Sequence, residues 1–110
     1  MSQIYTQRFA GARLAGGVWH LLLTAQPGYV WVIRDLIFTN EQQTGAATYQ
    51  FVITTRDDLG VTLASGLETP ALTSIHADVR QELLEDETLS IFSDAADFSV
   101  LVTGYKFTAG

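Results

Sequence analysis

Residues 49–56 read Tyr-Gln-Phe-Val-Ile-Thr-Thr-Arg, and apolar side chains alternate with polar ones along this stretch. Tyr49, Phe51 and Ile53 fall on one side of an extended chain, and most of the polar residues fall on the other. The same period of two recurs in residues 75–80. Alternation of this kind indicates β-strands that bury one face.

Turn residues such as Gly16-Gly17 and Pro27-Gly28 divide the whole chain into about eight short segments, and no stretch has the pattern of an amphipathic helix of ordinary length. The expected strands cover residues 3–9, 17–25, 29–39, 46–56, 60–65, 73–80, 88–93 and 97–107. Strands spaced by about 8–14 residues are typical of sandwiches and jelly rolls. The sequence therefore predicts an all-β fold, a two-layer antiparallel β-sandwich of jelly-roll type.

The apolar faces of these strands define the expected core. It consists of Tyr49, Phe51, Ile53, Val61, Leu63, Ile75, Val79, Leu89, Ile91, Phe98, Val100 and Val102. At 110 residues with 47% hydrophobic residues, we expect residues 1–110 to form a single domain with a core of its own.

Composition excludes several classes of function. The chain has no cysteine, so it forms neither disulfides nor thiolate metal sites. With six Lys and Arg residues and a net charge of −6, it lacks the clustered cations that bind nucleic acid, and an anionic membrane would repel it. No apolar stretch is long enough to span a bilayer, and the N-terminus lacks the pattern of a signal peptide. We expect no cofactor.

Residues 29–39 are apolar on both faces, which a half-exposed strand would not be. Either this strand is covered on both sides within the domain, or one of its faces meets a partner subunit. Residues 1–10 add apolar side chains, and they form either an edge strand or an arm that lies on a neighbour. We therefore expect a homo-oligomer. The candidate interface residues are Ile4, Tyr5, Phe9, Tyr29, Trp31 and Ile33.

Charged residues inside the apolar strands need partners, because a buried charge is costly when unpaired. Arg34 and Asp35 lie within 29–39, and Asp78 and Arg80 lie on another strand with complementary charges. These four residues are candidates for structural ion pairs that fix the strand register. In the last strand the alternation changes phase near Gly104, which predicts a β-bulge there.

Residues with the chemistry of an active site are sparse. His20 and His76 are the only histidines, and neither lies in a metal-binding pattern, so we assign no catalytic residue and no metal ligand. A metal-dependent jelly-roll enzyme using one of them is the opposing hypothesis. Acidic residues in predicted loops form a solvated rim or, if two loops meet, a calcium site. The aromatic residues suggest a second alternative, a glycan-binding platform. Its candidates are Tyr5, Trp19, Tyr29, Trp31, Tyr49 and Tyr105.

Three stretches resemble small β-sandwich virion proteins of tailed bacteriophages. Residues 26–40 read Gln-Pro-Gly-Tyr-Val-Trp-Val-Ile-Arg-Asp-Leu-Ile-Phe-Thr-Asn, and they are similar to a Pro-Ala-Gly turn and Val-Val-Arg-Asp strand of that family. Residues 76–89 resemble its Asp-x-Arg segment, although Glu85-Asp86 stands where the family has Pro-Gly. Residues 98–105 resemble its last strand. The likeness extends over about residues 4–107.

The resemblance implies a non-enzymatic virion structural protein, a minor tail protein more than a capsid decoration protein. It implies a location in the virion after assembly in the host cytoplasm. The expected partners are further copies of the chain and other virion proteins, and the family has no known catalytic residues to carry over.

Overall fold

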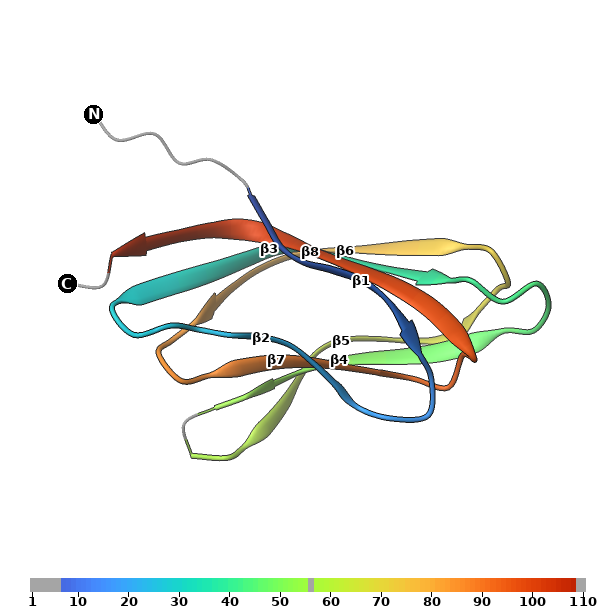
Figure 1. The fold of residues 1–110 in the computed structure, drawn as a ribbon, viewed down its shortest axis with the longest axis horizontal. Coiled ribbons are helices and arrows are strands. Elements are labelled where there is room, and N and C mark those ends of the chain that lie inside the picture. The colour runs from blue at the N-terminus through green and yellow to red at the C-terminus, as the bar shows by residue number, and fades with distance from the viewer. Residues whose placement is uncertain (1–6, 56, 109–110) are drawn as a thin grey trace.

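The computed structural model describes residues 7–55 and 57–108, and these fold into eight β-strands with no helix among them (Figure 1). The all-β prediction is confirmed. The strands are β1 (Gln7–Ala15), β2 (His20–Thr24), β3 (Tyr29–Asn40), β4 (Ala47–Thr54), β5 (Gly60–Thr69), β6 (Ser74–Leu83), β7 (Thr88–Ser93) and β8 (Asp97–Thr108).

The strands form two antiparallel four-stranded sheets that pack as layers, as Figure 1 shows. Sheet A has the order β1-β8-β3-β6, and sheet B has the order β2-β7-β4-β5. The strand pairs β1·β8 and β3·β6 lie in sheet A, and the pairs β2·β7 and β4·β5 lie in sheet B. Successive pairs, from β1·β8 through β2·β7 and β3·β6 to β4·β5, therefore alternate between the two layers. A double-stranded ribbon wound in this way is a jelly roll, so the predicted architecture is confirmed.

The first strand differs from its expected range of residues 3–9. β1 extends to Ala15 and pairs with β8 from Gln7 opposite Gly104 to Ala15 opposite Asp97. Its pairing continues through Gly11, which stands opposite Leu101. Residues 7–10 therefore belong to an edge strand of sheet A.

The core lies between the two sheets, and most of its expected members are buried there. The confirmed residues are Tyr49, Phe51, Ile53, Leu89, Ile91, Phe98, Val100 and Val102. Leu63, Ile75 and Val79 are partly buried against this core. Val61 is 52% exposed, so its placement in the core was wrong: β5 is the outer strand of sheet B, and Val61 lies at this open edge.

A change of phase within β3 explains why this strand is apolar on both faces. Its register shifts between Ile33 and Asp35 relative to both neighbouring strands. Before the shift Ile33 points into the core, and after it Leu36 and Phe38 do. Because a shift by one residue exchanges the two faces of a strand, residues of both alternating sets reach the interior, Ile33 from one set and Leu36 and Phe38 from the other. Ile33 is 0% exposed, which corrects its assignment as an interface residue.

Gly104 lies at an irregularity, as expected, but the extra residues belong to its neighbours. The additional residue Phe9 of β1 lies opposite the step from Val102 to Thr103, and the additional residue Arg34 of β3 lies opposite the step from Thr103 to Gly104. A Cβ atom on Gly104 would lie 1.9 Å from the Val32 carbonyl oxygen and 2.8 Å from the Phe9 ring. The glycine lets two bulged strands approach β8 closely, while β8 itself keeps its alternation.

Candidate functional site

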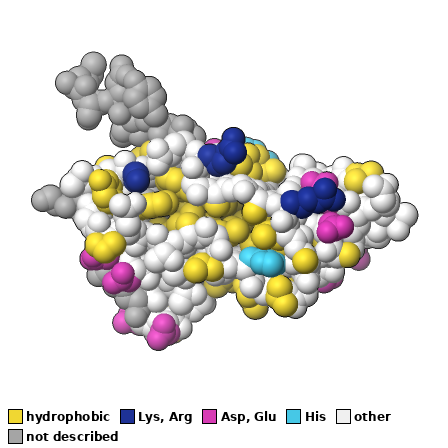
Figure 2. All heavy atoms as spheres, viewed as in Figure 1, with side chains coloured by type: hydrophobic (Ala, Val, Ile, Leu, Met, Phe, Trp, Pro, Cys, Tyr) yellow, Lys and Arg dark blue, Asp and Glu magenta, His cyan; other side chains and the backbone are white. Residues whose placement is uncertain are grey.

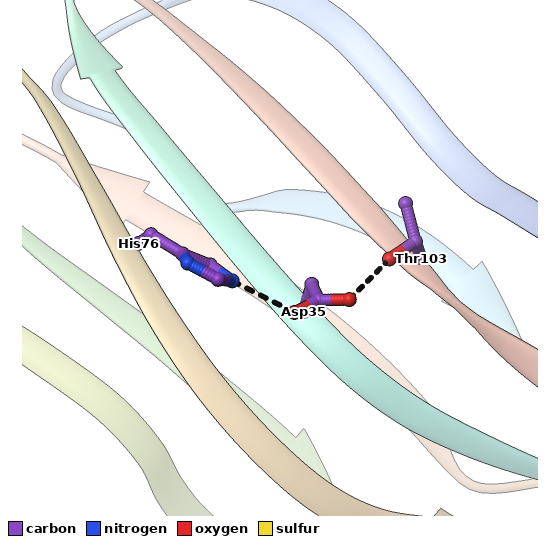
Figure 3. Close-up of polar contacts among 3 residues, drawn as sticks. All are labelled: Asp35, His76 and Thr103. Atoms are coloured by element: carbon purple, nitrogen blue, oxygen red, sulfur yellow. Dashed lines mark hydrogen bonds and ion pairs between the residues drawn. The ribbon is translucent and has the colours of Figure 1, made fainter. Parts of the chain in front are cut away.

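A polar clamp joins three strands on the outer face of sheet A (Figure 3). Asp35 on β3 accepts a hydrogen bond of 2.7 Å from His76 Nε2 on β6 and one of 3.0 Å from Thr103 Oγ1 on β8. The hydrogen bond from His76 is the main cause that lowers the pKa of Asp35 below 3.8, and the hydrogen bond from Thr103 and the charges of His76 and Arg34 act in the same direction. Burial opposes these effects.

The order of groups in this clamp suits a structural role. Nucleophilic catalysis needs a histidine between the acid and the hydroxyl, so that the imidazole takes the hydroxyl proton. Here Asp35 lies between His76 and Thr103, and the threonine donates its proton to the carboxylate directly. The trio therefore ties β6, β3 and β8 together beside the register shift.

The four residues expected to form ion pairs lie close to this clamp. Asp35 stands opposite Asp78 in the register of β3 and β6, and Arg34, Asp78 and Arg80 line one hollow with Val79. Within residues 7–55 and 57–108, the recorded ion pair of this group joins Asp35 to His76. Pairing of Arg34 with Asp78 and of Asp35 with Arg80 stays a prediction.

Three of the expected interface residues gather where β1, β3 and β8 lie side by side. The rings of Phe9 and Trp31 are 4.7 Å apart, and Lys106 Nζ lies 5.0 Å from the Tyr29 ring and 5.2 Å from the Trp31 ring. Both contacts with Lys106 are within range for a cation–π interaction. The buried Trp31 indole N–H has no hydrogen-bond acceptor among the described residues. Ile4 and Tyr5, the other candidates, lie outside the described residues.

The two histidines are separated by the fold. His20 is on β2 of sheet B, donates through Nε2 to the Ala15 carbonyl at 2.6 Å, and packs edge-on against Phe98. His76 is on sheet A. In the described part of the chain, no three His, Cys, Asp or Glu side chains are grouped so that they could hold a metal ion.

The aromatic residues considered for a glycan platform differ in accessibility. Tyr49 is 7% exposed and stacks on Phe38 at 4.7 Å, and burial raises its pKa above 10.0. It is a core residue, which corrects its place among the platform candidates. Trp19 is 52% exposed and contacts Phe92 at 5.4 Å, so its ring is available to a partner.

A hollow of about 340 Å³ opens between β5 and β6, the outer strands at one edge of the sandwich. Ile53, Val61, Leu63 and Leu84 give it an apolar lining, and Glu82 and Glu87 lie at its border. This hollow is the reason that Val61 is exposed although its strand pattern points it inward.

Asn40 is a structural residue that the sequence analysis did not single out. It is fully buried at the end of β3, and its side-chain amide donates to the carbonyls of Gly45 and Thr69, each at 3.0 Å. Its Oδ1 accepts from the Gln42 amide at 3.0 Å. Its position at the end of an apolar strand, just before a polar turn, was the available signal.

No helix able to cross a membrane occurs in residues 7–55 and 57–108. No protein-family model and no curated protein sequence matches the chain.

Solved structures with a similar fold come from unrelated sources. A chain of the infectious bursal disease virus Gx strain is 16% identical with a TM-score of 0.53, over 94% of this chain and 31% of the viral one. The Drosophila NLP-core, whose structure bears on pentamer formation and histone binding, is 13% identical with a TM-score of 0.54, over 93% and 100% of the two chains.

A Bacillus endospore appendage, from a family of disulfide-linked pili, is 14% identical with a TM-score of 0.54, over 99% of this chain and 93% of that one. This chain thus spans less than a third of the viral protein and nearly all of the other two. At these identities the comparisons establish a shared β-sandwich fold.

Proposed function

We propose that this chain is a non-enzymatic structural protein of a bacteriophage particle, an accessory β-sandwich module that docks on the virion as a homo-oligomer. The observation that carries the proposal is the jelly-roll order of its strands, and a viral chain has a similar fold over 94% of this chain. The resemblance of residues 26–40 and 76–89 to tailed-phage proteins favours a minor tail protein over a capsid decoration protein.

Two properties of the surface support a role in assembly. The polar clamp at Asp35 connects strands and leaves no activated nucleophile. Large hydrophobic side chains are exposed on several strands and loops. Val18, Trp19 and Leu21 follow one another closely along the chain, and exposed apolar groups that lie together favour association. The exposed large hydrophobic residues are Val18, Trp19, Leu21, Leu59, Val61, Leu72, Leu84 and Phe107.

The test is the protein content of purified particles. We expect mass spectrometry to find the chain in particles banded by density, and immunogold labelling to place it on the tail. Label on the head would favour the decoration role. A chain that is abundant in the lysate and missing from the particles would exclude a virion protein.

An N-terminal arm remains part of this proposal. Residues 1–6 contain Ile4 and Tyr5 and lead into Gln7, the first residue of β1. Removing residues 1–6 should leave the sandwich folded and weaken its oligomer or its docking on particles. Unchanged sedimentation and unchanged docking would remove the arm from the proposal.

The exposed Trp19 favours a second candidate function, recognition of a glycan. Half-exposed indole rings stack on sugar faces, and Trp19 lies against Phe92 at the surface of sheet B. Saturable binding on a glycan array, with quenching of tryptophan fluorescence that is lost in Trp19→Ala, would support recognition. Absence of binding to every sugar would leave the structural role alone.

A further inference from the structure

Charged side chains are distributed unequally between the two layers. Five of the six Lys and Arg residues belong to strands of sheet A, namely Arg8, Arg13, Arg34, Arg80 and Lys106. In the view of Figure 2, the basic side chains lie over the upper layer, and acidic ones lie at the right-hand end and also at the lower left, where Figure 1 places both the β6–β7 turn and the β4–β5 hairpin. The strands of sheet B contain one Asp, Glu, Lys or Arg residue, Glu68 near the end of β5.

The outer face of sheet B is therefore without charge over its centre. Leu21 and Val52 both stand opposite Ser90, and Gln50 stands opposite Phe92. These side chains point away from the core, because their neighbours along each strand, such as Phe51 and Ile91, are buried in it. We call this surface the neutral face. It consists of Leu21, Gln50, Val52, Thr54, Thr62, Ser65, Thr88, Ser90 and Phe92, with Trp19 at its border.

The neutral face shares one property with an interface centre, its lack of charged residues, and it carries the aromatic ring of Phe92 with Trp19 at its border. Interface centres are depleted of charged residues and enriched in aromatic ones, whereas a solvated sheet face in a chain of net charge −6 would be expected to carry some of that charge. Leu21 is 64% and Trp19 is 52% exposed. Gln50 Nε2 donates a hydrogen bond of 2.7 Å to Thr62 Oγ1, so two polar groups of the face are paired with each other.

The chemistry of the neutral face indicates which kind of partner it binds. It has no charge with which to complement a charged partner. Its polar groups are hydroxyls and an amide, which both donate and accept hydrogen bonds, so the face is its own complement under two-fold rotation. Two copies that meet here keep their acidic loops, which lie at the strand ends, away from the centre of contact.

The size of the face also suits a dimer. Four strands spaced by about 4.8 Å give a width of about 19 Å, and strands of five to ten residues give a length of roughly 17–34 Å. The resulting area of several hundred Å² is of the order of the ~800 Å² of accessible surface that each partner contributes to a standard interface.

We propose that the neutral face packs against the neutral face of a second copy, giving a dimer in which the two B sheets are stacked. This proposal deepens the structural function above, since it assigns the surface through which the module associates with itself.

The sharpest test compares two serines in equivalent positions. Ser90 is half-buried on β7, the second strand of sheet B, and Ser99 is half-buried on β8, the second strand of sheet A. Ser90→Glu and Ser99→Glu each add one negative charge to the same net charge of −6, so general repulsion rises equally. Ser99 also donates to Glu41, and its variant therefore has the greater local disturbance.

We expect sedimentation equilibrium to show a wild-type dimer, a weakening of at least tenfold in Ser90→Glu, and a near wild-type dimer in Ser99→Glu. Circular dichroism and thermal unfolding report whether each variant folds. If Ser90→Glu does not fold, Leu21→Ser replaces it, because Leu21 is largely exposed and should weaken the dimer without loss of core packing. A monomeric wild type, or equal weakening by both serine variants, would overturn the proposal.

The absence of cysteine gives an independent measurement. With a short bismaleimide, Ser90→Cys should form covalent dimers and Ser99→Cys should not. Crosslinking of both variants or of Ser99→Cys alone would contradict the stacked B sheets. The particle assay separates the two proposals. If the chain is found in particles but does not form this dimer, only the proposed dimer surface is refuted. If the neutral-face dimer forms but the chain is missing from particles, only the virion role is refuted.

Discussion

At Gly104, a missing side chain allows β1, β8 and β3 to lie together where two of them carry an extra residue. The Val32 carbonyl and the Phe9 ring occupy the space that a Cβ atom would need. Gly66 has a similar role, because a Cβ atom there would lie 2.3 Å from the Tyr49 ring. Glycine is needed at these two positions because neighbouring atoms lie too close for a Cβ atom, and not because the backbone has a positive φ.

We predict that Gly104→Ala lowers the free energy of unfolding by at least about 2 kcal/mol, because the strands must separate to admit the methyl group. Gly60→Ala is the matched control: its Cβ atom would meet Val52 at 3.5 Å, an ordinary contact. Urea unfolding should find the control within about 0.5 kcal/mol of the wild type. Equal stability of the two variants would contradict the close approach at Gly104.

Asp35 gives a prediction that depends on pH. We expect Asp35→Asn to reduce the free energy of unfolding by about 0.5–1 kcal/mol at neutral pH, because the hydrogen bond from His76 favours the ionised carboxylate. The pKa of Asp35 is lowered in the folded state, so its contribution is complete above the ordinary value of 3.8 and is lost as the pH falls through the lower folded value.

Unfolding measured from neutral pH to below pH 3.8 should therefore show the curves of wild type and Asp35→Asn converging at the acidic end. Asp78→Asn is the comparison, since Asp78 stands opposite Asp35 in the register. Removing one of two like charges that face each other should be neutral or slightly stabilising. Curves for Asp35→Asn that stay parallel to the wild type would reject the clamp.

At the scale of the elements, the register shift in β3 decides which side chains reach the core. Relative to β8, Arg34 is the extra residue, and it lies between Ile33 and Asp35. Deleting Arg34 should turn residues 29–33 over, or break their pairing, and expose Ile33. We expect a loss at least as large as the roughly 2–5 kcal/mol of a core Ile→Ala substitution.

Arg34→Ala keeps the backbone and tests the side chain alone, so it should cost less than about 1 kcal/mol. Soluble expression and urea unfolding of both variants provide the measurement. If the deletion were tolerated as well as the substitution, the register shift would not determine the core face of β3.

The edge strand β5 offers a matched pair of valines. Val61 is 52% exposed beside the hollow between β5 and β6, and Val102 on β8 is fully buried. Val61→Thr should change stability by less than about 0.5 kcal/mol, and Val102→Thr should cost about 1–3 kcal/mol, because a hydroxyl is buried without a partner. A large loss at Val61 would mean that the hollow is closed in solution.

For the whole molecule, the separation of charge from the neutral face predicts how salt acts on association. Two chains of net charge −6 repel each other, while their proposed contact contains no charge. Raising the salt from 0.1 M to 1 M shortens the Debye length from about 10 Å to about 3 Å and screens that repulsion. The dimer should therefore become tighter with salt, as measured by sedimentation. Weaker association in salt would indicate a contact built on ion pairs.

Much of the fold was determined by local pattern. The alternation in residues 49–53 and 98–102 identified buried positions of β4 and β8, because the period of two is a property of the extended chain itself. The lack of charge in β2, β4 and β7 was also visible in the sequence, and it is the signal that would have found the neutral face.

Only the tertiary structure decided the features that depend on which strands lie side by side. Which apolar residues of β3 point inward follows from its register against β6 and β8, and the partner of Asp35 follows from the strand that lies beside it. Val61 has an inward pattern but lies at an open edge. The alternation in a sequence shows which residues of a strand share a face. It does not show the register, the bulges or the sheet edges, because these arise from pairing between segments that are far apart in the chain.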